Sequence, residues 1–323
     1  MSVPILSFDQ VIDGLLSMKQ PYFSNYLAVY SSWYGGIITD PALMMLPLDD
    51  HMVNRGDGVF EVFKCIDWNI YALARHLDRM KHSMEGSFLE PPVDSQRLIE
   101  IVRATVRAGN SGTCLVRIYV SRGPGSFSPS PYETVGSQLY VIVTALEVSP
   151  EKYEKGVKLA TTGIPIKTDY FANLKNCNYL PNVLMKKEAL DRGADYSVSL
   201  DERGFLAEGA TENIGIVTKK GELLIPRFSR ILRGITVTRA IELASRFAGD
   251  RISAVAEADI TREQAAEAAE ILVFGTSFNI FPVVEYDGNR IADGRPGPVF
   301  RRLAELMVED QTKNRDMLTP VNT

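Results

Sequence analysis

Lys175 is the residue of this sequence whose surroundings most suggest chemistry. It lies in the run Asn173–Tyr179 (NLKNCNY), which holds amide and apolar side chains and no acidic residue. Removing a lysine without a counter-ion from water lowers its pKa, and the neutral amine can then form a Schiff base. Taken alone, however, most lysines are ordinary surface residues, and Lys186 and Lys187 on a polar helix face are examples.

Other motifs that mark common enzyme classes are missing from the sequence. His51, His76 and His82 lack metal-ligand spacing, so no metal site is expected. No GxSxG sequence marks a serine nucleophile, and GPGSFSPSP is neither a P-loop nor a dinucleotide fingerprint. Chemistry at Lys175 would therefore need a borrowed cofactor.

The composition narrows the partners and the compartment. The chain has 35 basic and 40 acidic residues and no Lys/Arg-rich run, which disfavours nucleic acid and favours a small-molecule partner. Cys65, Cys114 and Cys177 are too few and too far apart for a disulfide framework. No run of about 18 apolar residues suggests a membrane span, and the N-terminus lacks the pattern of a signal peptide. We expect a cytoplasmic protein.

The elements that must position Lys175 are predicted to form two α+β or α/β domains, residues 1–147 and a larger 148–323, joined at the polar stretch Glu147–Gly156. In the first, helices are expected at 8–18, 74–84 and 95–108, and strands within 36–71 (including MMLPLDD, residues 44–50), at 115–121 and at 138–146. In the second, helices are expected at 182–192, 235–247 and 261–269 between short strands. The polar tail from Glu309 is expected to fray.

Several separate motifs resemble those of the fold-type-IV (class IV) pyridoxal-phosphate enzymes. They are YSSWYGGIITDPALMMLPLDDHMVNRGDGVFE, HLDRM, KNCNYLPN, GFLAEG and ILRGIT, and they occur in the family's order between about Tyr30 and Pro298. That family includes branched-chain aminotransferases, D-amino acid aminotransferases, aminodeoxychorismate lyases and (R)-selective amine transaminases. The chain is most similar to the plant-type aminodeoxychorismate lyase/D-amino acid aminotransferase group. The resemblance implies a two-domain D-amino acid aminotransferase-like fold, pyridoxal 5'-phosphate (PLP) as cofactor, and a homodimer.

The resemblance also implies roles at the cofactor ring. Lys175 would form the Schiff base to the cofactor, pass it to the substrate amine and then move the Cα proton. Glu208, in LAEG, would pair with the pyridine nitrogen and keep it protonated, so that the ring accepts electrons. Tyr179 would hydrogen-bond the phenolic oxygen, although its spacing from Lys175 differs by one residue from that in branched-chain enzymes. Asn213, in TEN, is expected to fix the local backbone.

The cofactor phosphate would be held by three separate pieces of chain. Arg79, in HLDRM, matches an arginine that binds phosphate, and its fork suits bidentate bonds to phosphate oxygens. Ile235 and Thr236 would open a helix after Gly234, where unpaired amides and the helix dipole favour an anion. Thr276, in FGTS, would add a hydroxyl and an amide at a strand end.

Residues that contact the substrate are less clearly marked. Phe60 lines up with a pocket-wall aromatic, Lys64 lies on the same strand face, and Ser277 follows Thr276. Arg117 resembles the arginine that helps to hold the substrate carboxylate in branched-chain enzymes, and Arg122 competes for that role. Phe60, Lys64, Arg117 and Arg122 could each equally be a core or salt-bridge residue.

One segment departs from the bacterial D-amino acid aminotransferases. Where their loop carries an arginine and a histidine that trap the carboxylate, this chain has Phe127 and Pro129, and Phe60 replaces a tyrosine. That carboxylate trap is therefore absent, although another arrangement could serve D-amino acids. The loop Arg122–Gly136 is the candidate for an element that closes the site, and it could reach across from a partner subunit.

Such a site can serve three reactions, namely transamination of D-amino acids, transamination of branched-chain amino acids and the lyase reaction. We predict a PLP-dependent aminotransferase that moves an amino group between an amino acid and a 2-oxo acid, with D-amino acid specificity ahead of branched-chain specificity. The alternative is an aminodeoxychorismate lyase that releases pyruvate and 4-aminobenzoate. A non-catalytic protein that has kept the fold is disfavoured, because the lysine, glutamate, arginine and threonine positions are all filled.

Overall fold

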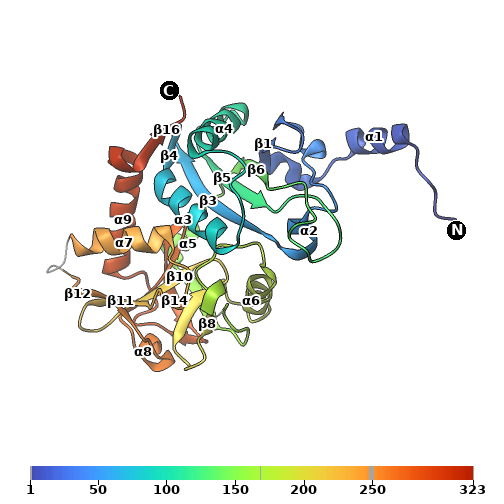
Figure 1. Ribbon diagram of the computed structural model, residues 1–323. Coiled ribbons are helices and arrows are strands. Elements are labelled where there is room, and N and C mark those ends of the chain that lie inside the picture. The colour runs from blue at the N-terminus through green and yellow to red at the C-terminus, as the bar shows by residue number, and fades with distance from the viewer. Residues whose placement is uncertain (1, 168, 247–250, 323) are drawn as a thin grey trace.

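The computed structural model describes residues 2–167, 169–246 and 251–322, whose strands form two sheets with helices around them (Figure 1). The first sheet is antiparallel, with the strand order β16-β4-β3-β5-β6-β1-β2. Its strands are β1 (Tyr26–Ser31), β2 (Gly36–Ile38), β3 (Gly58–Ile66), β4 (Asn69–Tyr71), β5 (Cys114–Ser121), β6 (Gln138–Ala145) and β16 (Leu318–Pro320).

Strand β3 presents its two faces to different parts of the molecule. Side chains alternate along a strand, so Val59 and Phe63 enter the core of the first sheet, which the helices α3 (Leu73–Gly86) and α4 (Ser95–Ala108) cover. Phe60 and Lys64 have the opposite parity and lie outside that core cluster. Strand β3 therefore contributes side chains to the core on one face and to the region between the sheets on the other.

The second sheet is mixed and has the order β12-β11-β10-β13-β14-β7-β8-β9, with β15 paired to β14 and a further β9–β10 pairing. Its strands are β7 (Val157–Thr161), β8 (Tyr196–Leu200), β9 (Leu206–Gly209), β10 (Asn213–Val217), β11 (Glu222–Pro226), β12 (Ala254–Ala258), β13 (Glu270–Gly275), β14 (Asn279–Tyr286) and β15 (Asn289–Arg290). Between β6 and β16 the chain also forms the helices α5 (Pro150–Lys155), α6 (Leu180–Asp191), α7 (Ile235–Ser245), α8 (Arg262–Ala266) and α9 (Pro298–Lys313).

The polar tail is ordered, so the prediction that it frays is wrong. Helix α9 runs from Pro298 to Lys313, and β16 then pairs with β4 at the edge of the first sheet. Val321, just beyond β16, is fully buried. The chain therefore returns to its N-terminal sheet, where Leu318 pairs with Tyr71.

The predicted strand at residues 44–50 is also wrong. A 3-10 turn at Pro41–Leu43 leads into a loop, and the carboxylate of Asp50 then caps α2 (His51–Arg55). The predicted helix at 8–18 forms as α1 (Phe8–Ser17) with a capping box, but it buries none of its residues and stands away from the sheets (Figure 1). Helix α7 ends at Ser245, and Phe247 lies outside the described residues.

Membrane insertion finds no support in the described helices, since none has the length and apolar composition of a transmembrane span.

Candidate active site

Lys175 lies on an extended segment that runs beside β3. The amide of Phe60 donates to the carbonyl of Lys175 at 3.0 Å, and the amide of Cys177 donates to the carbonyl of Gly58 at 2.9 Å. The amide of Lys175 itself donates to Oγ of Ser83 on α3 at 3.1 Å. These bonds fix the backbone of Lys175 against β3 and α3.

The amine of Lys175 is buried against an aromatic ring, and charged side chains lie near it. Its Nζ lies 4.5 Å from the ring centroid of Phe60. Burial lowers the pKa of Lys175 to about 8, and the positive charge of Arg79 adds to this effect, while Glu61 and Glu208 oppose it. Because a substantial fraction of this amine is neutral near physiological pH, it can act as a nucleophile or a base.

Glu208, on β9, shares a cavity with Lys175. One carboxylate oxygen accepts from the amide of Leu232 at 3.1 Å, and the Glu208 carbonyl accepts from Oγ of Ser199 at 2.9 Å. Burial raises the pKa of Glu208 to about 7, against the lowering effect of that amide and of Lys167 and Lys175. Glu208 is therefore held in place, and its carboxylate can accept a hydrogen bond from a protonated ring nitrogen.

Tyr179 completes the group predicted to surround the cofactor ring. It precedes α6, packs edge-to-face on Phe60 at 5.2 Å between centroids, and lines the cavity with Lys175 and Glu208. Burial raises the pKa of Tyr179, so its phenol is neutral and can donate a hydrogen bond. The structure thus brings Lys175, Tyr179 and Glu208 together.

Arg79 is held on α3 by a buried carboxylate. Its Nε and Nη2 donate to the two oxygens of Glu61 at 2.6 and 2.7 Å, and its Nη1 donates to the Arg233 carbonyl at 3.2 Å. His76 contacts the same carboxylate at 2.7 Å. Burial alone would raise the pKa of Glu61, but Arg79 and His76 outweigh it and hold it at about 2. The guanidinium therefore lies beside the residues that open α7.

The start of α7 has the form of an anion site. No side chain among the described residues caps this helix, so the amides of its first turn, which begins at Ile235 and Thr236, are free to bind a ligand. Gly234 precedes it, and a Cβ there would collide with Oδ1 of Asn213. Asn213 in turn donates to the Leu232 carbonyl at 3.0 Å. This close approach of backbone to Asn213 requires glycine.

Thr276 follows the strand next to Asn213. In the β10–β13 pairing Asn213 lies opposite Phe274, two residues before Thr276. Thr276 is half-buried, and its neighbour Ser277 is exposed. An arginine fork, an uncapped helix start and a threonine at a strand end are donor types that fit a phosphate group, and a raised-pKa glutamate beside a lysine fits a pyridine ring with an aldehyde. The residues present therefore fit PLP.

A cavity of about 630 Å³ adjoins this region. Arg117 and Ser277 both line it, and so does Tyr119, whose ring stacks on Phe60 at 5.5 Å between centroids. Nη1 of Arg117 donates to Oγ1 of Thr144 at 2.9 Å. Three of the predicted substrate residues, Phe60, Arg117 and Ser277, thus lie at or next to one cavity.

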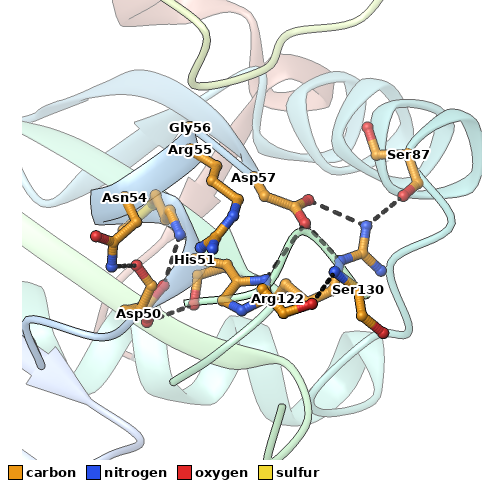
Figure 2. Close-up of polar contacts among 12 residues, drawn as sticks. Asp50, His51, Asn54, Arg55, Gly56, Asp57, Ser87, Arg122 and Ser130 are labelled. Atoms are coloured by element: carbon orange, nitrogen blue, oxygen red, sulfur yellow. Dashed lines mark hydrogen bonds and ion pairs between the residues drawn. The ribbon is translucent and has the colours of Figure 1, made fainter. Parts of the chain in front are cut away.

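Two other predicted substrate contacts have different partners. Lys64 does not line that cavity, and its amine donates to Asn279 and Gln311. Figure 2 shows that Arg122 points toward Asp57, with bonds of 2.7 and 3.0 Å to the carboxylate. Its remaining bonds, at 2.8 Å, reach the carbonyls of Ser87 and Phe88 after α3. These contacts make Arg122 a residue that ties the start of β3 to the end of α3.

Sequence reasoning missed two residues of this site. Glu61 is fully buried and orients Arg79. The sequence offered one clue to it, because His76 and Arg79, three residues apart on one helix face, can share a single acidic partner. Lys167 lies with its amine 5.1 Å from the Tyr179 ring centroid and donates to Oδ1 of Asn176 at 3.1 Å. No local pattern distinguished Lys167 from a surface lysine.

The architecture and this site together define a known class of protein. Residues 58–286 match the family described as "Amino-transferase class IV". The chain therefore belongs to the class IV aminotransferases, and it is a transaminase of fold type IV with PLP as its cofactor.

Individual relatives come from two activity groups. The chain is 38% identical over 313 residues to "D-amino-acid transaminase, chloroplastic" of Arabidopsis thaliana, which covers 96% of this chain and 82% of the relative. It is 29% identical over 288 residues to "Branched-chain-amino-acid aminotransferase" of Pseudomonas aeruginosa, covering 84% and 89%. Among solved structures, the "branched-chain aminotransferase from thermophilic archaea Thermoproteus uzoniensis with norvaline" superposes with a TM-score of 0.81 at 25% identity, over 92% of this chain and 99% of that one.

Proposed function

We propose that this class IV aminotransferase moves amino groups between D-amino acids and 2-oxo acids, with Lys175 as its catalytic residue. The observation that carries the assignment of Lys175 is its amine, with a pKa of about 8, in one cavity with Glu208 and Tyr179. The 38% identity to a D-amino-acid transaminase over nearly the whole chain supports the substrate class. When bound, PLP supplies an aldehyde and an electron-accepting ring.

The residues around the ring divide the work. Lys175 would hold the cofactor aldehyde, and its amine would move the proton at the substrate Cα. Phe60, which is 8% exposed and lies against the lysine amine, keeps water from that position. Glu208 would accept the hydrogen bond of the pyridine nitrogen and so keep a proton there, and Tyr179 would donate to the phenolic oxygen.

The phosphate is bound by groups that do no proton transfer. Arg79 supplies its remaining N–H donors, Ile235 and Thr236 supply first-turn amides of α7, and Thr276 supplies a hydroxyl. The bond from Arg79 to the carbonyl before Gly234 supports a common location for the first two. The inclusion of Thr276 is supported by the pairing of β13, which Thr276 follows, with the strand of Asn213, against which Gly234 packs.

The substrate side is proposed from the large cavity. Arg117, with a cationic guanidinium on the cavity wall, would bind the substrate carboxylate, and Ser277 would contact its polar groups. The loop 122–136 carries the exposed aromatics Phe127 and Tyr132, which suits a segment that closes the site in a homodimer. The division into domains 1–147 and 148–323 follows the two sheets, except that β16 belongs to the first sheet. The cysteines, all within the described residues, form no disulfide, which favours the cytoplasm.

The test is turnover by the purified protein loaded with PLP. With 2-oxoglutarate as acceptor, D-alanine should give pyruvate faster than L-leucine gives its 2-oxo acid, and Lys175→Ala should abolish both reactions while Lys187→Ala keeps them. A borohydride-reducible bond to the cofactor in Lys175→Ala would refute the lysine assignment. Preference for L-leucine would instead make the protein a branched-chain enzyme, the second candidate, which the Pseudomonas aeruginosa relative supports. Release of 4-aminobenzoate from aminodeoxychorismate without transamination would refute both.

A further inference from the structure

Lys64 is a buried amine with amide partners. It is 5% exposed, and its amine donates to Oδ1 of Asn279 and, at 3.2 Å, to Oε1 of Gln311. The two amides also bond each other, from Gln311 Nε2 to Asn279 Oδ1 at 2.7 Å and from Asn279 Nδ2 to Gln311 Oε1 at 3.2 Å. Lys64 comes from β3, Asn279 opens β14 and Gln311 lies on α9. The cluster therefore joins the first sheet to two elements from the second half of the chain.

Burying an amine among neutral amides carries a desolvation cost. Burial lowers the pKa of Lys64 to about 7, because two neutral amides do not replace the hydration of an ammonium group. A packed apolar side chain commonly serves stability better at such a position. The lysine is thus better explained by what it holds in place.

What Lys64 holds is the turn between β13 and β14. That turn begins with Thr276 and Ser277 and ends at Asn279, whose backbone has a left-handed φ of 69°. Asparagine is among the residues that adopt this conformation most readily, so the backbone here needs no further support. The bonds of its side chain to Lys64 and Gln311 instead tie the end of the turn to β3 and α9.

The residue before Gln311 makes the matching link to α7. Asp310 accepts from Arg239 of α7 at 2.8 and 2.5 Å and from the Tyr71 hydroxyl at 2.5 Å. Arg239 also bonds Glu242 at 2.6 Å, and Glu242 accepts both bonds of Arg75 on α3 at 2.7 and 3.0 Å. Arg75 lies one helical turn before Arg79. Asp310 and Gln311 of α9 thereby connect the elements that carry the proposed phosphate site, which are α3, α7 and the turn of Thr276.

We propose that Lys64 and Gln311 are positioning residues for the cofactor phosphate, which fix the Thr276–Ser277 turn relative to α3 and α7. This inference rests on the proposed phosphate site. Neither side chain lines the cavity that Lys175 shares with Glu208. They act through Asn279, so their loss changes the place of the Thr276 hydroxyl and amide rather than the chemistry at Lys175.

The test compares PLP with pyridoxal, which lacks the phosphate. Lys64→Met keeps an unbranched apolar chain and removes the donors, and Gln311→Met removes the acceptor on α9. Lys219→Met, at an exposed lysine, is the matched control. Dissociation constants are measured by titrating the apoproteins with each ligand and following the ligand's absorbance, after thermal melting has confirmed that each variant is folded.

Both cluster variants should bind PLP about tenfold more weakly, a loss of about 1.4 kcal/mol, and should bind pyridoxal like the wild type and Lys219→Met. Equal weakening of both ligands, or no weakening, would overturn the inference. If Lys64→Met does not fold, Gln311→Met decides alone. Thr276→Val distinguishes a failure of the proposed phosphate site from a failure of the positioning role. If it leaves the preference for PLP over pyridoxal unchanged, the proposed phosphate site itself fails, whereas if only the cluster variants leave it unchanged, the positioning role fails.

Discussion

Lys175 should react with aldehydes as an amine whose pKa is about 8, well below its ordinary value of 10.5. The perturbation is a change of pH applied to the apoprotein, and the observable is the rate at which pyridoxal becomes attached to Lys175. Because only the neutral amine attacks a carbonyl, this rate should rise about tenfold per pH unit up to pH ~8 and then level off.

The size of the effect follows from the neutral fraction. At pH 7 an amine with a pKa of 8 is roughly 10% neutral, whereas one with a pKa of 10.5 is roughly 0.03% neutral, so the reactive fraction differs about 300-fold. Lys187, an exposed lysine paired with Asp191 on α6, provides the comparison within the same chain. Burial is the main cause of the lowered pKa of Lys175, so the advantage should disappear when the protein is unfolded in urea.

The assay traps the attached pyridoxal with borohydride at timed intervals between pH 6 and 10 and quantifies the labelled peptides by mass spectrometry. Glu208→Gln should shift the Lys175 profile to lower pH, because the Glu208 charge raises the pKa of Lys175. A Lys175 rate that climbs to pH 10 without levelling off near pH 8 would refute the reasoning, since burial would then not have lowered the pKa of this amine.

Three further outcomes test the site and its support. Burial raises the pKa of Glu208 from 4.5 to about 7. Its contribution to apoprotein stability is therefore complete below pH 4.5 and lost as pH rises through 7, so Glu208→Gln should raise the free energy of unfolding at pH 8, by roughly 1–3 kcal/mol, but not at pH 4.5. Glu61→Gln leaves Arg79 and His76 without their buried counter-charge and should lower the free energy of unfolding by about 3–5 kcal/mol in urea titrations, whereas the exposed Glu154→Gln should not. Deleting residues 318–323 removes β16 from the edge of the first sheet and should lower the thermal midpoint, and an unchanged midpoint would contradict the role given to the tail.

Local signals in the sequence predicted the elements that depend on local physics. The helix expected at 95–108 has those bounds, and Thr261 and Gln264 form the expected capping box at the start of α8. The strand at residues 44–50 failed because a proline and a pair of aspartates favour a turn and a helix cap over pairing. Such errors reflect competition between signals within a few residues.

The larger errors came from contacts between distant residues. The partners of Lys64 lie 215 and 247 positions away, and no spacing rule indicates that an amide will be found there. The tail is polar in sequence because α9 is half exposed, yet Asp310 and Gln311 face inward and bind other elements. The segment of Lys175 pairs with β3 through an isolated bridge, which no hydrophobic periodicity predicts. Only the motif around Lys175 indicated its role.

The charges around Arg79 explain why position matters so much in the proposed phosphate site. Glu61 remains ionised, with its pKa at about 2, and occupies the Nε–Nη2 edge of the Arg79 guanidinium. The pair has no net charge, so Arg79 brings directed N–H donors to a phosphate rather than an uncompensated positive charge. The amides of α7 and the hydroxyl of Thr276 are likewise dipoles whose effect falls steeply with misalignment. A dianion bound by dipoles depends on their alignment more than on electrostatic attraction at a distance. In this chain the alignment is supplied by a polar network from α3 and β3 to α9.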